Sequence, residues 1–486
     1  MHGMVWFRSD LRLRDNTALD HACRRAERVS AVFLTAPEQW REHDWGATKV
    51  DFVMRNVREL ASSLAERGIA LHLLAAPRFA DAPAVLVELM REQGCGALFF
   101  NREHEVNERR RDRAVRVAVE AWGAAVEEYD DQTILAPDRV RTKTGGFYRV
   151  FGPYRRAWLE ELDRGSRPTP RGLPAHPASP PVDRPRLPRQ VAGYGPSPVP
   201  AGLWPAGERE ARRRLDAFVA GAIDRYHVDR DFPAVDGTSA LSPYLAVGAV
   251  SARQCLAAAS DANTGWVDGG RPGVAAWIGE LVWREFYRHV LVGFPRVSKN
   301  RPFRSETDEI EWRDDDESFR RWAAGATGVP IVDAAMRQLH RTGWMHNRLR
   351  MVVAMYLTKH LLLDWRRGER HFMERLIDGD LANNNGGWQW SASTGCDAAP
   401  YFRIFNPVRQ SRRFDPQGRF ILRFCPELRD LSGNALHDPS ILPAERRARL
   451  DYPPALVDHR SARARAIAAF HKLASSPRVR RAERSV

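Results

Sequence analysis

Met4-Val-Trp-Phe7 is the first of five short apolar runs in the first 130 residues of this chain. Runs of this kind are typical of strands that are buried on both faces of a parallel sheet. Segments with helical spacing separate them, and this alternation predicts a doubly wound, Rossmann-like α/β domain. The other expected strands are Ala31–Thr35, Leu71–Ala75, Ala97–Phe100 and Val126–Tyr129, and the expected helices are Lys49–Arg67, Pro83–Gln93 and Glu105–Trp122. The runs carry no G-x-G-x-x-G turn or Walker motif, so the fold class alone does not identify a ligand.

The second half of the chain has a different pattern. From about Gly165 to Gly207, proline, glycine, serine and arginine dominate without periodicity, which predicts an extended linker. Beyond it the periodicity is helical and strand-like alternation is nearly absent, so a large all-α domain is expected. The predicted divisions are an α/β domain over 1–130, an interdomain linker over 131–207, an all-helical domain over 208–475 and a basic tail over 476–486. The expected helices are Glu208–Ala222, Ala275–Val292, Ser318–Ala324, Ile331–Thr342, Asn347–Trp365 and Glu369–Leu376.

The charge balance favours a polyanionic partner. The 486 residues carry a formal net charge of +14, and nearly all of the positive charge is arginine. Guanidinium groups bind phosphate in a bidentate manner, so a nucleic acid is the expected partner. The alternative is an arginine-biased genome whose charged helix faces are simply solvated. A nucleotide-binding protein with an arginine-rich RNA-binding face is a further alternative.

Cysteine usage and hydropathy indicate a reducing, cytoplasmic setting. The five cysteines are scattered and form no C-x-x-C pair, a pattern that favours neither a disulfide nor a zinc site. The N-terminus does not have the pattern of a signal peptide. The most apolar later run, Met351 to Leu363, is interrupted by Lys359 and His360, so no membrane span is expected.

The stretch Asp378-Gly-Asp380-Leu-Ala-Asn-Asn384-Asn-Gly-Gly-Trp388-Gln-Trp390 combines acids, amides, glycines and tryptophans. Buried amides and carboxylates need hydrogen-bond partners, so this composition is unfavourable for an ordinary core. It suits a pocket that holds a flat polar ring and stacks bases or passes electrons. The stretch therefore predicts a redox-cofactor site rather than a structural helix.

A second polar and aromatic set falls on one face of a predicted helix. Trp277, Glu280, Arg284 and Tyr287 are spaced i, i+3, i+7 and i+10, and Trp283 lies beside Glu280. Such a face can both stack on a ring and hydrogen-bond to it. The alternative is an amphipathic helix on whose surface Glu280 and Arg284 form an ion pair.

Two shorter motifs add polar groups. In Gly343–Met351, Asn347 is either a pocket residue or the N-cap of a helix, and Arg350 is expected to pair with Asp378 or Asp380. The cluster Gly237-Thr-Ser-Ala-Leu-Ser242 precedes a helix and offers hydroxyl and backbone N–H donors to a phosphate. An ordinary Ser/Thr helix cap is the alternative for this cluster.

Together these motifs resemble those of the photolyase/cryptochrome flavoproteins, specifically the bacterial class I cyclobutane pyrimidine dimer photolyases. The resemblance begins at Val5-Trp-Phe-Arg8-Ser-Asp-Leu11-Arg-Leu-Arg14-Asp-Asn16, continues to Asp451-Tyr452-Pro453 and is densest between 226 and 412. It implies an α/β antenna domain, a linker and an all-helical domain that holds a U-shaped FAD.

The resemblance also implies roles for single residues. Tyr226, Thr238, Ser239, Ala240, Leu241 and Ser242 would hold the FAD diphosphate and ribose, and Trp277, Glu280, Arg284, Asn347, Arg350, Asp378, Asp380 and Asn384 would line the FAD pocket. Asn384 would face flavin N5 and favour the reduced flavin. Trp312, Trp365 and Trp388, which spacing alone assigns to the core, would carry an electron from the surface to the oxidised flavin.

The implied activity is light-driven repair of cyclobutane pyrimidine dimers by excited FADH⁻, with the dimer flipped out of single- or double-stranded DNA. Glu280, Asn347 and Asn384 would be catalytic. Contacts with the dimer and the DNA are expected from Arg230, Glu280, Trp283, Tyr287, Asn347, Arg348, Met351, Trp390, Arg403 and Gln410. A monomer without an obligate protein partner is expected.

A blue-light photoreceptor without repair activity, the cryptochrome type, is the alternative within this family. The (6-4) photolyases and animal cryptochromes place histidines where this chain has Asn347 and Met351, which favours dimer repair. Asn107, Glu108 and Lys299 resemble the antenna site of members that use 5,10-methenyltetrahydrofolate. A deazaflavin or an empty antenna site is the alternative, and Glu108 would then be an exposed helix charge.

Overall fold

The computed structural model describes residues 1–165, 167–174, 182–183 and 186–474. The predicted basic tail, 476–486, lies outside these residues. By their internal contacts the residues form two compact units. Counting the described residues only, the first unit consists of those within Met1–His227, Thr238–Pro295 and Ile377–Asp380, and the second unit of those within Val228–Gly237, Arg296–Leu376 and Leu381–Val486.

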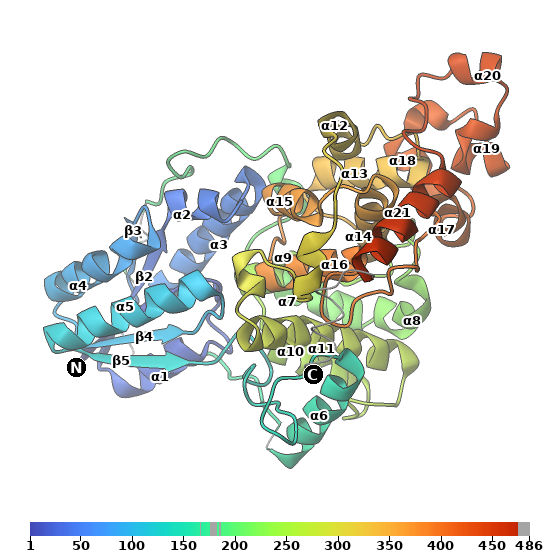
Figure 1. The fold of residues 1–486 in the computed structure, drawn as a ribbon. Helices are drawn as coiled ribbons and strands as arrows, with labels where there is room; N and C mark the ends of the chain where they lie inside the picture. Colours follow the sequence, from blue (N-terminus) through green and yellow to red (C-terminus); the bar gives the residue numbers. More distant parts are fainter. Residues whose placement is uncertain (166, 175–181, 184–185, 475–486) are drawn as a thin grey trace. The chain divides into compact units, whose positions relative to one another are not determined.

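The first unit contains a five-stranded parallel sheet (Figure 1). Its strands are β1 (His2–Phe7), β2 (Arg28–Thr35), β3 (Leu71–Ala75), β4 (Ala97–Asn101) and β5 (Ala125–Tyr129). Their order, β3-β2-β1-β4-β5, reverses direction at β1, as in a doubly wound fold. All five predicted strands are confirmed, with ends that differ by three residues or fewer.

Five helices belong to this α/β part: α1 (Thr17–Arg25), α2 (Pro37–Glu42), α3 (Ala47–Ala65), α4 (Ala82–Gln93) and α5 (Val106–Trp122). The sequence pattern predicted the last three and missed α1 and α2. Helix α1 starts at a side-chain cap, because Asn16 accepts a hydrogen bond from the Leu19 N–H at 3.0 Å. Helix α2 is only six residues long, too short for periodicity to identify it.

The first unit also contains helices α6 (Phe151–Arg164), α7 (Glu208–Val219), α9 (Ser242–Val247), α10 (Ala252–Ala262) and α11 (Pro272–Gly293), and the short α8 (Tyr226–Asp229) runs from it into the second unit. Helix α6 lies inside the segment predicted as the interdomain linker. The unit therefore includes much more than the predicted 1–130.

A buried ion-pair network joins the sheet to this later segment. Asp131, which follows β5, accepts hydrogen bonds from Arg12, from Arg253 at 2.6 Å and from the Thr17 hydroxyl at 2.7 Å. Arg253 also donates to Asp15 at 2.9 Å. All five side chains are buried, so each charge depends on its partners for solvation.

The second unit is helical, as predicted for this part of the chain (Figure 1). Its helices are α12 (Asp316–Ala324), α13 (Pro330–Thr342), α14 (Asn347–Met355), α15 (Trp365–Arg375), α16 (Leu381–Ala392), α17 (Pro407–Phe414), α18 (Arg419–Phe424), α19 (Gly433–His437), α20 (Ala444–Ala448) and α21 (His459–Ala474). None of the described helices is both long and apolar enough to cross a membrane. All five cysteines are buried thiols.

The predicted single helix Asn347–Trp365 is wrong. Helix α14 passes into a π-helical turn, η6 (Tyr356–His360), and the chain then breaks at Leu362, whose φ is 55°. A new helix, α15, starts at Trp365 because Asp364 caps it by accepting a hydrogen bond from the Arg366 N–H at 3.0 Å. The apolar run hid this break because Leu361, Leu362 and Leu363 are all buried.

Candidate functional site

In the first unit, helix α11 carries the predicted polar and aromatic face. Trp277 is buried and packs on Phe218, with ring centroids 5.1 Å apart. Trp283 stacks on Phe151 of α6, with centroids 3.6 Å apart and an interplanar angle of 9°. This stacking fixes the plane of the Trp283 indole ring.

Arg284 does not have the environment of an exposed ion-pair residue. Its guanidinium donates to the carbonyl oxygens of Gln132 at 2.8 Å and Leu245 at 3.3 Å. Burial, with the nearby Arg288 cation, lowers the pKa of Arg284 to about 10. The alternative of a solvated Glu280–Arg284 surface pair therefore does not describe this side chain.

The acids of the Asp378–Trp390 stretch belong to the first unit as well. Asp378 is buried, and Asp380 forms an ion pair with the buried Arg288 of α11. In the second unit, Arg350 donates to the Met345 carbonyl oxygen at 2.9 Å. The pairing of Arg350 with Asp378 or Asp380 stays a prediction.

The rest of this stretch lies in helix α16, so the residues predicted for the cofactor site are carried by a helix. Asparagine and glycine are poor helix formers, and tertiary hydrogen bonds compensate. Gln389 accepts from the Phe303 N–H at 2.7 Å and donates to Asn385 at 2.7 Å. The Asn384 amide donates through Nδ2 to the Glu369 carbonyl oxygen at 2.9 Å, which leaves its oxygen as the group that can accept a hydrogen bond.

Three tryptophans of the second unit share one hydrophobic core. Trp365 and Trp388 are buried in it, and Trp312 packs against it while partly exposed. Trp322, which the sequence analysis did not single out, packs edge-on against Trp388 with centroids 6.0 Å apart. Spacing along the chain gives no signal for this contact, because the two residues lie on different helices.

Gly368 of α15 makes room for Trp388. A Cβ atom at residue 368 would lie 2.1 Å from the outer ring of this tryptophan. Gly368→Ala is expected to displace Trp388 and to destabilise the protein by about 1–3 kcal/mol, the usual result of overpacking. Thermal unfolding measures the stability. An unchanged melting temperature together with an unchanged tryptophan emission spectrum would contradict the prediction. Gly152→Ala in α6 is the control, because a Cβ atom there meets no heavy atom within 4 Å.

The start of α14 corrects a second interpretation. The N-cap is His346, whose Nδ1 accepts from the Arg348 N–H at 3.2 Å, so Asn347 is not the cap. Asn347 is the first helical residue and is exposed. Arg348 binds Asp231 at 2.6 Å and lies over the Phe414 ring, 4.6 Å from its centroid.

The Gly237–Ser242 cluster precedes helix α9, as predicted, but its hydroxyls do not cap that helix. The N-cap is Leu241, which has no side-chain cap bond, and Ser242 is exposed. Ala240 has a left-handed conformation with φ 48°. The alternative of an ordinary Ser/Thr cap is therefore wrong.

The predicted residues differ widely in exposure. Buried are Tyr226, Leu241, Trp277, Trp365, Asp378, Asn384 and Trp388; half-buried are Glu108, Arg230, Thr238, Ser239, Ala240, Glu280, Trp283, Arg284, Tyr287, Trp312, Arg348, Arg350, Met351, Asp380, Trp390 and Gln410; exposed are Asn107, Ser242, Lys299, Asn347 and Arg403.

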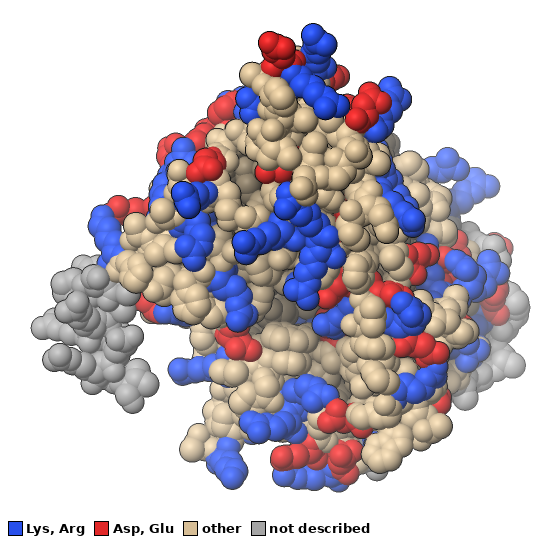
Figure 2. Space-filling model, turned by 90° about the vertical axis from the view of Figure 1, so that its right-hand side faces the viewer, with Lys and Arg blue, Asp and Glu red and all other residues tan. Residues whose placement is uncertain are grey.

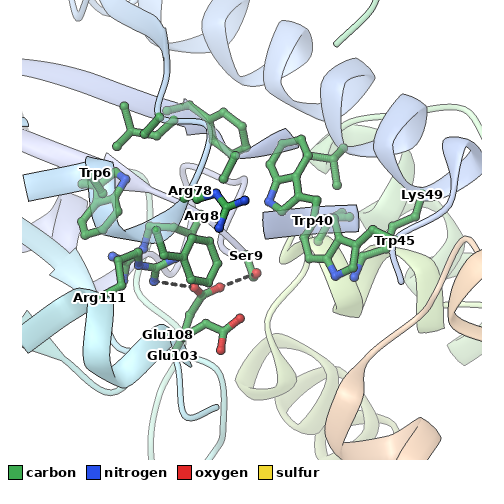
Figure 3. A pocket seen from close by; sticks show the side chains of 18 of the residues that line it. Trp6, Arg8, Ser9, Trp40, Trp45, Lys49, Arg78, Glu103, Glu108 and Arg111 are labelled. Carbon is green, nitrogen blue, oxygen red and sulfur yellow. Dashed lines mark hydrogen bonds and ion pairs between the residues drawn. The ribbon is translucent and has the colours of Figure 1, made fainter. Parts of the chain in front are cut away.

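A pocket lies at the carboxyl ends of β1, β2 and β4 (Figure 3). In doubly wound sheets this edge is the usual ligand-binding edge. The pocket is lined by aromatic rings and charged groups, among them Trp6, Arg8, Ser9, Trp40, Trp45, Lys49, Arg78, Glu103, Glu108 and Arg111. The sequence analysis had singled out only Glu108 as a ligand-binding residue of this set.

Burial and neighbouring charges shift the pKa values of the charged groups in the pocket. The Lys49 ammonium lies 3.3 Å from the centroid of the Trp45 ring, and burial lowers its pKa to about 8. Burial and the neighbouring Glu105 raise the pKa of Glu108 well above its ordinary value. Burial would also raise the pKa of Glu103, but the Arg111 and Arg8 guanidinium groups outweigh it and lower this pKa to about 2.

Glu108 and Asn107 start helix α5 beside His43, a residue that the sequence analysis missed. The Asn107 amide nitrogen lies 3.0 Å from His43 Nε2, and Glu108 lies 3.4 Å from His43 Nδ1. The Glu108 side chain is only 12% exposed, so the alternative of an exposed helix charge is wrong. Lys299, the third predicted antenna residue, is exposed in the second unit.

Comparison with known proteins assigns the chain to a protein family. The DNA photolyase family matches residues 4–178, and the family described as the FAD binding domain of DNA photolyase matches residues 277–472. The chain belongs to the DNA photolyase family. The deoxyribodipyrimidine photo-lyase of Salmonella typhimurium is 45% identical to this photolyase over 468 residues, which are 96% of this chain and 98% of the relative.

Solved structures agree with this photolyase fold. A bacterial class III photolyase from Agrobacterium tumefaciens matches with a TM-score of 0.85 and 34% identity, covering 98% of each chain. A cryptochrome from Synechocystis matches with a TM-score of 0.84 and 27% identity, covering 96% of this chain and 99% of the other. Both halves of the photolyase fold predicted from the sequence, the parallel α/β part and the large helical part, are thereby confirmed.

Proposed function

We propose that this photolyase uses light to repair pyrimidine dimers in DNA. The observation that carries the proposal is the full-length similarity to an enzyme named deoxyribodipyrimidine photo-lyase. FAD is the cofactor, in agreement with the matched FAD-binding family domain. Lys and Arg side chains are spread over the face shown in Figure 2, with Asp and Glu among them, and the net charge of +14 suits a DNA substrate.

Two observations fit a bound flavin. The Asn384 amide is oriented by Glu369 so that its oxygen can accept a hydrogen bond from an N–H group of the ring. Gly279 of α11 and Gly387 of α16 each border open space, because a Cβ atom there would meet no heavy atom within 4 Å. When bound, reduced FAD supplies the light-excited electron that opens the cyclobutane ring.

We propose that the FAD-binding residues are those of the predicted set. Trp277 presents a buried ring and Arg284 a half-buried cation from α11, and Asp380 is a neighbouring carboxylate of Arg284. Asp378 is a buried acid of the same unit. From the second unit, Asn384, Asn347 and Arg350 are proposed. The left-handed backbone of Ala240, directly before helix α9, supports a phosphate-binding role for residues 238–242.

We propose that the flipped dimer stacks on Trp283 and Trp390 and hydrogen-bonds with Glu280 and Asn347. Trp283 is preorganised for stacking by Phe151, and a stacked base contributes about 1–3 kcal/mol. Arg230, Arg348, Arg403 and Gln410 are proposed to bind the DNA backbone, with Tyr287 and Met351 near the dimer. Phosphate contacts position the strand without reading its sequence.

We further propose that an antenna chromophore binds near Asn107 and Glu108. The pocket of Figure 3 is lined by aromatic rings and contains the Lys49 ammonium. These groups suit a ligand that has a flat ring and a hydrogen-bond acceptor. 5,10-Methenyltetrahydrofolate, with Lys299 as a third contact, is the first candidate and a deazaflavin is the second. A cytoplasmic monomer is the proposed form of the enzyme.

The deciding experiment follows repair of a thymine-dimer oligonucleotide by the reduced holoenzyme, in the dark and under near-UV to blue light. Recovery of absorbance near the thymine maximum only in the light is the expected result. Bound FAD without recovery on single or double strands would favour the cryptochrome-type photoreceptor instead.

Glu280→Ala is expected to lower the repair yield under saturating light by about two- to tenfold, the effect of one lost hydrogen bond to the dimer, while FAD stays bound. The same oligonucleotide assay measures the yield, and flavin absorbance measures the FAD content. Glu160→Ala, which removes an exposed ion pair with Arg164, is the control. An unchanged yield would remove Glu280 from the repair mechanism.

A further inference from the structure

Lys359 is the buried lysine that interrupts the apolar run of the second unit. It lies in the π-helical turn η6, and its side chain is 0% exposed. Burial lowers its pKa well below the ordinary value. A buried amine of this kind needs hydrogen-bond partners, and π-helical turns occur frequently at functional sites.

The partners of Lys359 lie at the end of helix α16. Its Nζ donates to the Ala392 carbonyl oxygen at 3.0 Å and to the Ser393 hydroxyl at 2.9 Å. Ala392 is the last residue of α16, where helix carbonyl groups have no partner within the helix. Lys359 therefore supplies the donor that this buried helix end lacks.

The C-terminal helix closes over this lysine. The ring centroid of Phe470 in α21 lies 3.6 Å from the Lys359 ammonium. Arg465 of the same helix donates to the His360 carbonyl oxygen at 2.6 Å, and His459 lies 2.6 Å from His360 through their ring nitrogens. The turn that presents Lys359 is thus held in place by α21.

The turn at the end of α16 is hydrogen-bonded to the backbone of Trp390. Ser393 has a left-handed conformation with φ 64°, and its N–H donates to the Trp390 carbonyl oxygen at 3.3 Å. The Ala399 N–H donates to the same oxygen at 3.1 Å. Trp388, in contrast, packs against Gly368 and Trp322, away from this turn.

We propose that Lys359 is a positioning residue that orients Trp390 toward the dimer by fixing the left-handed turn at the end of α16. The proposal rests on the proposed repair function. It predicts that loss of the Lys359 donor weakens dimer binding much more than it affects reactions that depend on Trp388.

The test compares Lys359→Met, which keeps the side-chain length and removes the donors, with Lys359→Gln, which keeps an N–H donor on a shorter chain. Dimer affinity, FAD content and the photoreduction rate of the oxidised holoenzyme are measured for each. Lys359→Met is expected to weaken binding of a thymine-dimer oligonucleotide about tenfold, as for the loss of a strong buried hydrogen bond, while FAD content and photoreduction stay close to wild type. Lys359→Gln is expected to bind more tightly than Lys359→Met.

Lys472→Met is the matched control, because it removes a lysine of α21 that pairs with Glu311 on the surface. It should leave all three quantities unchanged. Equal affinity of Lys359→Met and wild type, or a parallel loss of FAD, photoreduction and affinity, would overturn the positioning role. Absence of repair by the wild-type enzyme would instead contradict the proposed function.

Discussion

Trp388→Phe is expected to slow photoreduction of the oxidised holoenzyme about a hundredfold or more, equivalent to roughly 2.7 kcal/mol of added barrier. A phenyl ring is much harder to oxidise than an indole ring, so the electron path through Trp388, Trp365 and Trp312 that the family resemblance implies would lose its first donor. Time-resolved flavin absorbance after a blue flash measures the rate. Repair by chemically pre-reduced enzyme should be retained, because that reaction does not use the path.

Trp322→Phe is the control for this substitution. Trp322 is equally buried, packs on Trp388 and donates its indole N–H to the Val353 carbonyl oxygen at 3.1 Å. Its loss should lower stability and leave photoreduction close to wild type. Normal photoreduction in Trp388→Phe would break the proposed path.

Asp131→Ala is expected to destabilise the first unit by about 3–5 kcal/mol, because it leaves two buried guanidinium groups without their shared carboxylate. Arg12 and Arg253 both pair with Asp131, and each of the three side chains is at most 6% exposed. Chemical unfolding monitored by tryptophan emission measures the loss. Glu88→Ala removes an exposed ion pair with Arg91 and should cost about 0.5 kcal/mol or less.

Acid should lower the unfolding free energy of the same unit over a defined pH range. Burial opposes ionisation of Asp131, but Arg12 and Arg253 outweigh it and lower the pKa of Asp131 below its ordinary value. The pKa of Glu103 is lowered from 4.5 to about 2. A carboxyl group whose folded pKa is lowered stabilises the protein fully above its unfolded pKa and loses this effect as the pH falls. The unfolding free energy of the wild type should therefore decrease from pH 4.5 toward pH 2, with a smaller decrease in Asp131→Ala.

Part of the fold could be predicted because patterns of neighbouring residues in the sequence determine it. The five strands follow from uninterrupted apolar runs, and α11 follows from helical spacing around Trp277. The break after His360 could not be predicted in this way. Leu361, Leu362 and Leu363 are as apolar as a helix interior, and the chain turns there because Asp364 caps the next helix.

The same distinction between local patterns and tertiary contacts applies to the candidate site. By itself, the sequence determined the family, the doubly wound α/β and all-helical parts, and the residue types proposed for flavin and dimer binding, because these depend on neighbouring residues in long motifs. Only the tertiary structure decided that Asp131 joins the sheet to α10, that Trp322 meets Trp388 and that Lys359 reaches the end of α16. These contacts link residues far apart in the chain, and a buried charge or ring acquires its partner only when packing removes it from water.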